Sequence, residues 1–184
     1  MLSAHEQEMR KMQKEQNDPQ QYSRRWNLRV FEVPEGDGET SDDCRKKCCD
    51  IFNQKVNVKT AVTDMEVVHR PSTPTGTKSR TTLVRFFDRK LRDQILAKRR
   101  KLKNKGIVIG EDPTFANHKV YMAAVKHSAC SSAWTVNGKT FAKLTNGTKM
   151  KLDMHTDVNR PFRRVMEGRQ PEVRVEETDR MEDA

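Results

Sequence analysis

Basic side chains that could grip a polyanion are concentrated in one stretch of this 184-residue sequence, from Lys78 to Lys105. The stretch holds twelve Lys or Arg residues against Asp88 and Asp93, and its surplus of ten positive charges equals the formal net charge of the whole chain, +10. Guanidinium and ammonium groups gathered in this way are typical of a nucleic-acid footprint. A solvated helix face is the alternative interpretation of the same charge run.

A strand and a helix must position these charges. Residues 81–87 predict the strand, and Asp88 begins a helix whose apolar side ends at Leu102. A capping-box pattern at Thr40 begins an earlier helix, in which cysteines and apolar residues recur at helical spacing. The full pattern is strand, helix, strand, strand, helix, strand, over residues 27–33, 42–55, 65–68, 81–87, 88–105 and 107–109.

This order, βαββαβ, predicts an α+β, ferredoxin-like fold. Two helices would pack on one face of a four-stranded antiparallel sheet and leave the other face open. An open sheet face beside a basic helix is the layout of the RNA-recognition module known as the RRM. The same layout also serves enzymes and metal-transfer proteins, so fold class alone does not decide the function.

The outward positions of the predicted sheet lack most of the aromatic residues on which an ordinary RRM stacks bases. Alternation along the first and third strands places Arg29 and Arg85 at those outward positions. The sequence therefore predicts guanidinium contacts with phosphates or base planes. Lys98, Arg99 and Arg100 on the following helix would act as a phosphate clamp if RNA binds, and as a solvated face if it does not.

A helix is predicted to follow the sheet, because Asp112 and Pro113 are an N-cap and first-turn pair. It would extend to about Ser128. Its expected inner side carries Phe115, Met122, Val125 and Ala129.

Two Asn-Gly pairs, at residues 137–138 and 146–147, predict a three-strand antiparallel meander over residues 133–152. Two-residue loops would fix its register, and the side chains on one face would then need the preceding helix as a cover. Trp134 and Phe141 are interpreted as part of that core and not as base-stacking residues. The expected cross-strand pairs are Val136 with Lys139, Trp134 with Phe141, Phe141 with Leu152, and Lys143 with Met150.

The charge and composition of the chain predict a folded middle and disordered ends, since 34% of the residues are hydrophobic and 34% are charged. The predicted divisions are a charged helix stub or disordered segment over 1–21, with the helix stopping before Pro19, an RRM-like domain over 22–112, a helix plus meander subdomain over 113–158, and a disordered tail over 159–184.

Several classes of function lack support in the sequence. It contains no Gly-rich phosphate loop, no hydrolase or zinc-protease motif and no clustered carboxylates, so we expect no enzyme activity and no cofactor. Its four cysteines include no CxxC pair and no His lies at zinc-ligand spacing from them, so we expect buried reduced thiols and no metal. Without a long apolar run or a secretion signal, the chain is expected to be intracellular.

Several strings along the chain resemble the first open-reading-frame protein of LINE-type non-LTR retrotransposons. They are YSRRWNLRVFEVPEGDGE, EVVHRPSTPTGTKSRTTLVRFFDRKLRDQIL, GIVIGEDPTFANHKVY and AWTVNGKTFAKL, and together they cover about residues 21–153. The resemblance implies an RRM plus a C-terminal domain that bind single-stranded RNA and act as a nucleic-acid chaperone in a ribonucleoprotein particle. It also implies a homotrimer held by a long N-terminal coiled coil, for which about twenty residues do not suffice, so the chain resembles a truncated or domesticated copy.

The resemblance also implies particular contact residues. The family's basic residues around its second and third strands match Arg70, Lys78, Arg80 and Arg85 of this sequence. Basic residues on the helix after the EDP turn fall near Lys119. The family's arginine pair there aligns closer to Tyr121 and Met122.

Together these features predict a largely sequence-independent protein that binds single-stranded RNA, with single-stranded DNA as a further ligand, in cytoplasmic ribonucleoprotein particles or the nucleus. The strand is expected to lie between the RRM and the meander. The alternative is a protein-interaction module of the same fold that binds an acidic partner protein.

Overall fold

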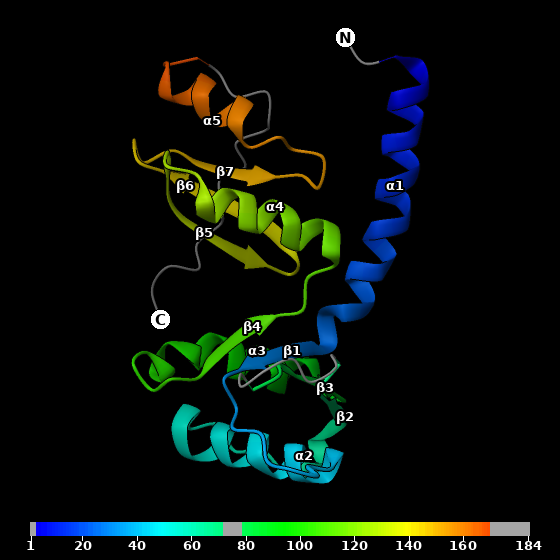
Figure 1. Ribbon diagram of the computed structural model, residues 1–184, viewed down its shortest axis with the longest axis vertical. Coiled ribbons are helices and arrows are strands. Elements are labelled where there is room, and N and C mark those ends of the chain that lie inside the picture. Colours follow the sequence, from blue (N-terminus) through cyan, green and yellow to red (C-terminus); the bar gives the residue numbers. More distant parts are fainter. Residues whose placement is uncertain (1–2, 72–78, 170–184) are drawn as a thin grey trace. The chain divides into compact units, whose positions relative to one another are not determined.

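Strand β1 (Asn27–Phe31) lies inside a four-stranded antiparallel sheet whose strand order is β2-β3-β1-β4. β1 pairs with β3 (Thr82–Phe86) and with β4 (Val108–Glu111), and β2 (Met65–His69) pairs with the other side of β3. These positions come from a computed structural model that describes residues 3–71 and 79–169 (Figure 1). The protein is an α+β protein, because the described residues also form five α-helices and a three-stranded antiparallel meander.

The chain divides into two compact units. Residues 23–112 form one unit, which contains the four-stranded sheet. The segments before and after those residues together form the other unit, which contains the meander. Each unit buries a hydrophobic core of its own. None of the described helices combines the length and the apolar character needed to cross a membrane.

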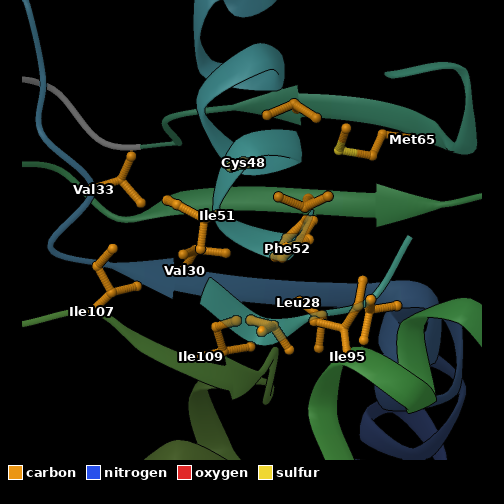
Figure 2. Packing of buried hydrophobic residues seen from close by; sticks show 14 of the residues in the cluster. Leu28, Val30, Val33, Cys48, Ile51, Phe52, Met65, Ile95, Ile107 and Ile109 are labelled. Carbon is orange, nitrogen blue, oxygen red and sulfur yellow. The ribbon is translucent and has the colours of Figure 1, made fainter. Parts of the chain in front are cut away.

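Two helices pack against the four-stranded sheet. Helix α2 (Ser41–Asp50) continues as a π-helical segment, Ile51–Val56, and helix α3 (Arg89–Ala97) continues as a 3-10 helix, Lys98–Leu102. Figure 2 shows side chains from both helices and from the strands meeting in one core, and they include Leu28, Val30, Cys48, Ile51, Phe52, Met65, Ile95 and Ile109.

Short-range signals decide where both helices begin. The predicted capping box at Thr40 is confirmed, because its hydroxyl accepts a hydrogen bond from the Asp43 N–H and the Asp43 carboxylate accepts one from the Thr40 N–H. Asp88 caps α3 by accepting a hydrogen bond from the Lys90 N–H at 2.8 Å. The residues predicted at helical spacing are buried: Cys44, Cys48, Ile51, Phe52 and Val56.

Strand β3 alternates in burial as predicted. Val84 and Phe86 are buried, whereas Leu83 and Arg85 are partly exposed. The outward side chains of β1 and β3 therefore share one face of the sheet, and they are Arg29, Phe31, Leu83 and Arg85.

The meander consists of β5 (Cys130–Val136), β6 (Lys139–Leu144) and β7 (Lys149–Leu152). Helix α4 (Phe115–Lys126) lies across it in Figure 1. The second core forms between them and includes Val120, Ala124, Ala142, Leu144, Met150 and Leu152.

Two predictions about α4 are wrong. Its N-cap is Thr114 and not Asp112, because the Thr114 hydroxyl accepts the hydrogen bond from the Asn117 N–H. Its buried residues are Val120 and Ala124, while Phe115 is 84% exposed and Val125 also faces solvent. The helix therefore packs the smaller residues Val120 and Ala124 against the meander and turns the side with Phe115 and Val125 outward.

The first hairpin of the meander has the predicted register, with Trp134 opposite Phe141, but the second does not. Phe141 pairs with Lys151 and not with Leu152, and Lys143 pairs with Lys149 and not with Met150. The loop has three residues, because the Leu144 N–H donates to the Thr148 carbonyl oxygen at 2.8 Å and Gly147 adopts φ +90°. A one-residue shift sends alternate side chains to opposite faces.

Helix α1 (Ala4–Ser23) passes through Pro19, where the sequence predicts a stop. The turns on either side of the proline are held by tertiary contacts within this unit. The Thr114 N–H donates to Gln21 Oε1 at 2.8 Å, and the Thr114 hydroxyl donates to Asn17 Oδ1 at 2.7 Å. These bonds offset the backbone hydrogen bond that a proline cannot make.

The expectation that residues 159–184 are disordered is wrong for the first part of that range. Residues Asn159–Met166 form helix α5 and bury Pro161, Phe162 and Val165. Phe162 packs edge-on against His127, with ring centroids 5.0 Å apart. Residues 170–184 lie outside the described residues.

Candidate nucleic-acid interface

Arg70 is a buried structural side chain. Its side chain is 1% exposed, and its guanidinium binds the carboxylate of Glu39, whose side chain is 3% exposed, at 3.0 Å. It also donates to the carbonyl oxygens of Val33, Pro34 and Arg80. An ion pair with this burial and this many hydrogen bonds holds loops together and leaves no donor directed at solvent.

Arg80 pairs with a second carboxylate of the same loop. Its Nη2 atom lies 2.5 Å from Glu35 Oε1, and its backbone N–H donates to Glu35 Oε2 at 3.0 Å. The hydrogen bonds from Arg80 lower the pKa of Glu35 from its usual 4.5 to about 2. A phosphate could bind Arg80 only in competition with this carboxylate.

Arg29 and Arg85 are the predicted sheet residues that solvent reaches most easily. Arg85 pairs with Glu66 at 2.7 Å, and both side chains are more than a third exposed. Exposed pairs of this kind contribute at most about 1 kcal/mol, so a phosphate could replace Glu66 at small cost. Arg29 is also about a third exposed and pairs with the buried Asp112 at 2.6 Å.

Asp112 thus has a different role from the predicted helix cap. It accepts hydrogen bonds from Arg24, Asn27 and Arg29, at distances between 2.6 and 3.4 Å. Within residues 23–112, this carboxylate joins the end of β4 to β1.

The segment 98–105 carries the most accessible positive charge. Lys98, Arg100, Lys101, Lys103 and Lys105 are exposed, and Arg99 is partly exposed. Among the residues that the structure describes, no carboxylate lies within ion-pair distance of any of these six side chains. The 3-10 helix fixes the first part of the segment by burying Leu102 in the core.

A groove of about 620 Å³ adjoins this segment. Arg99, Arg100 and Lys103 line it on one side, together with apolar residues 107–109 at the start of β4. Val108 is exposed and pairs with Phe31 of β1, and the next outward pair is Gly110 with Arg29. Val108 therefore lies on the outward side of the edge strand β4, the same side as Phe31 and Arg29 of β1.

The remaining predicted contact residues are placed separately. Lys119 is exposed on α4, and Tyr121 is partly exposed with its ring 6.3 Å from that of His118. These two residues belong to the other compact unit. Lys78 lies outside the described residues.

Sequence reasoning missed the acidic partners of the predicted arginines. Glu35 and Glu39 come from the loop after β1, and no spacing rule connects them to residues 31 to 45 positions later. The only signal was the clustering of Glu and Asp in PEGDGE, which reads equally well as a solvated turn.

Cys48 of α2 is a fully buried thiol in the core of this unit. Burial raises the pKa of the Cys48 thiol to about 12, so it stays protonated at neutral pH. Within residues 3–71 and 79–169, no group of His, Cys, Asp and Glu side chains could hold a metal ion.

Comparison with known proteins gives no family for this chain: no family model and no curated protein matches its sequence.

Proposed function

We propose that this chain is a non-enzymatic protein that binds single-stranded RNA with little sequence preference. In this proposal, residues 23–112 are an RRM-like domain of the kind found in the first open-reading-frame protein of LINE-type retrotransposons, and the protein acts as a nucleic-acid chaperone. The strand order β2-β3-β1-β4 and the packing of α2 and α3 on one face support the RRM-like assignment.

The observation that carries the proposal is the concentration of exposed positive charge in the segment 98–105. Its six basic side chains have no carboxylate partner among the described residues, whereas Arg29, Arg70, Arg80 and Arg85 each have one. Cations without carboxylate partners can bind phosphates and release the counterions condensed on the nucleic acid. We therefore assign most of the affinity to this segment, and a supporting role to Arg29 and Arg85.

The salt dependence of binding tests this assignment. Each phosphate neutralised on a single strand contributes about 0.7 to the slope of log affinity against log salt concentration. The triple variant Arg99→Gln, Arg100→Gln, Lys101→Gln should therefore flatten the slope by about 2. The measurement is fluorescence anisotropy of a labelled single-stranded RNA of about 30 nucleotides at several salt concentrations, long enough to span several contacts.

A matched control removes the same charge elsewhere in the same unit. Lys46, Lys55 and Lys59 are exposed, on or after α2. Their triple Gln variant should keep nearly the whole slope. Equal loss in both variants would mean that net charge alone attracts RNA, and no binding at low salt would bring forward a protein partner with an acidic surface.

A further inference from the structure

The meander has a second face that α4 does not cover. Ala142, Leu144, Met150 and Leu152 point into the core with α4. The alternate residues of the same strands point the other way, because side chains alternate across a strand. This outer face carries Trp134, Val136, Lys139, Phe141, Lys143, Lys149 and Lys151.

An aromatic pair lies at the centre of the outer face. Trp134 and Phe141 are cross-strand partners whose rings lie 6.0 Å apart at an interplanar angle of 15°. Phe141 is 9% exposed, while Trp134 remains partly exposed. Phe141 thus supports an indole ring that a planar ligand can reach.

Lysines surround this pair at positions set by the register. Lys151 is opposite Phe141, Lys143 is opposite Lys149, and Lys139 is opposite Val136. The three strands contain no Asp or Glu. This arrangement follows from the observed register of the second hairpin, which differs by one residue from the predicted one. The predicted register would have placed Leu152 opposite Phe141 and Met150 opposite Lys143.

We propose that the outer face of the meander is a second contact surface for single-stranded nucleic acid, with a base stacked on Trp134 and phosphates bound by the exposed Lys139 and Lys143. This inference rests on the proposed function and assigns a contact surface to the unit that contains the meander. Aromatic platforms combined with basic side chains are how proteins hold single strands without reading sequence. A partner protein would need a complementary acidic and apolar surface, whereas every base offers a planar face.

Tryptophan fluorescence tests the contact directly. The chain has two tryptophans, so Trp26→Phe leaves Trp134 as the only one. Titration with a 30-nucleotide oligouridylate should quench its emission with the same midpoint as the anisotropy change. Trp134→Leu should weaken RNA binding about tenfold, and Trp134→Phe should weaken it less because an aromatic face remains.

The outcomes separate this inference from the function on which it rests. If RNA binds by anisotropy but Trp134 emission does not change, the outer face is not a contact and the proposed function stands. If no variant binds RNA at low salt, both fail. Equal quenching by polyglutamate would assign the face to an acidic protein and overturn the inference. If circular dichroism shows that the Trp134→Leu variant is unfolded, the fluorescence titration of the Trp26→Phe variant still tests whether RNA contacts Trp134.

Discussion

Replacing Arg70 with Met should destabilise the unit of residues 23–112 without weakening RNA binding. Methionine fills similar space but leaves the buried Glu39 carboxylate without its guanidinium partner. Removing one member of a buried pair costs about 3–5 kcal/mol. The Lys47 ammonium lies 3.3 Å from the Glu39 carboxylate and would still partly neutralise it. We therefore expect the free energy of unfolding to fall by about 3 kcal/mol, at the low end of that range.

Urea denaturation can measure this loss in the correct unit. In a Trp134→Phe background, Trp26 reports on residues 23–112, to which it belongs. With a denaturant slope of about 1–1.5 kcal/mol per molar, the midpoint should fall by about 2–3 M urea. The second change Glu39→Gln removes the stranded charge and should restore part of the stability.

Two results would refute this reasoning. A midpoint within about 0.5 M of the parent would show that the ion pair is not buried as described. A folded Arg70→Met variant that loses as much RNA affinity as the Arg99, Arg100, Lys101 variant would show that Arg70 contacts RNA, contrary to its 1% exposure.

Two further predictions follow from other contacts. The Arg80 hydrogen bonds that lower the Glu35 pKa to about 2 stabilise the fold above pH 4.5, and this contribution should disappear as pH falls from 4.5 towards 2. The thermal midpoint of the Glu35→Gln variant should therefore fall less over that pH range than the midpoint of the parent protein. Parallel plots of midpoint against pH for the two proteins would contradict the pairing. Gly138→Ala should lower the thermal midpoint more than Gly147→Ala. Both glycines adopt positive φ, but only at Gly138 would the new methyl group lie about 2.3 Å from the Gln21 side chain. Equal midpoints of the two variants in thermal denaturation would show that the contact with Gln21 is unimportant.

Local patterns in the sequence were enough to predict much of the first unit. The capping box at Thr40, the spacing from Cys44 to Val56 and the alternation around Val84 each depend on residues close in sequence. Such signals are reliable because propensity, capping and burial agree at the same positions.

The errors arise where distant residues decide. A three-residue loop at Gly147 replaced the expected two-residue loop, and one position of slip exchanged the core and solvent sides of β7. Pro19 lies inside α1 because residues about 100 positions later bind the helix there. The candidate site changed for the same reason, since the loop carboxylates that hold Arg70 and Arg80 cannot be deduced from spacing.

The contacts of α1 have a consequence for the order of events during synthesis. Asn17 bonds to Asn117 across 100 positions, and the unit of residues 23–112 lies between them in the chain. Domains tend to fold as they leave the ribosome, at about 5–20 residues per second, so that unit can form while α1 still lacks its partner. We expect the α1 segment to stay undocked for several seconds, without the contacts that hold its turns on either side of Pro19, and to dock once α4 has been made.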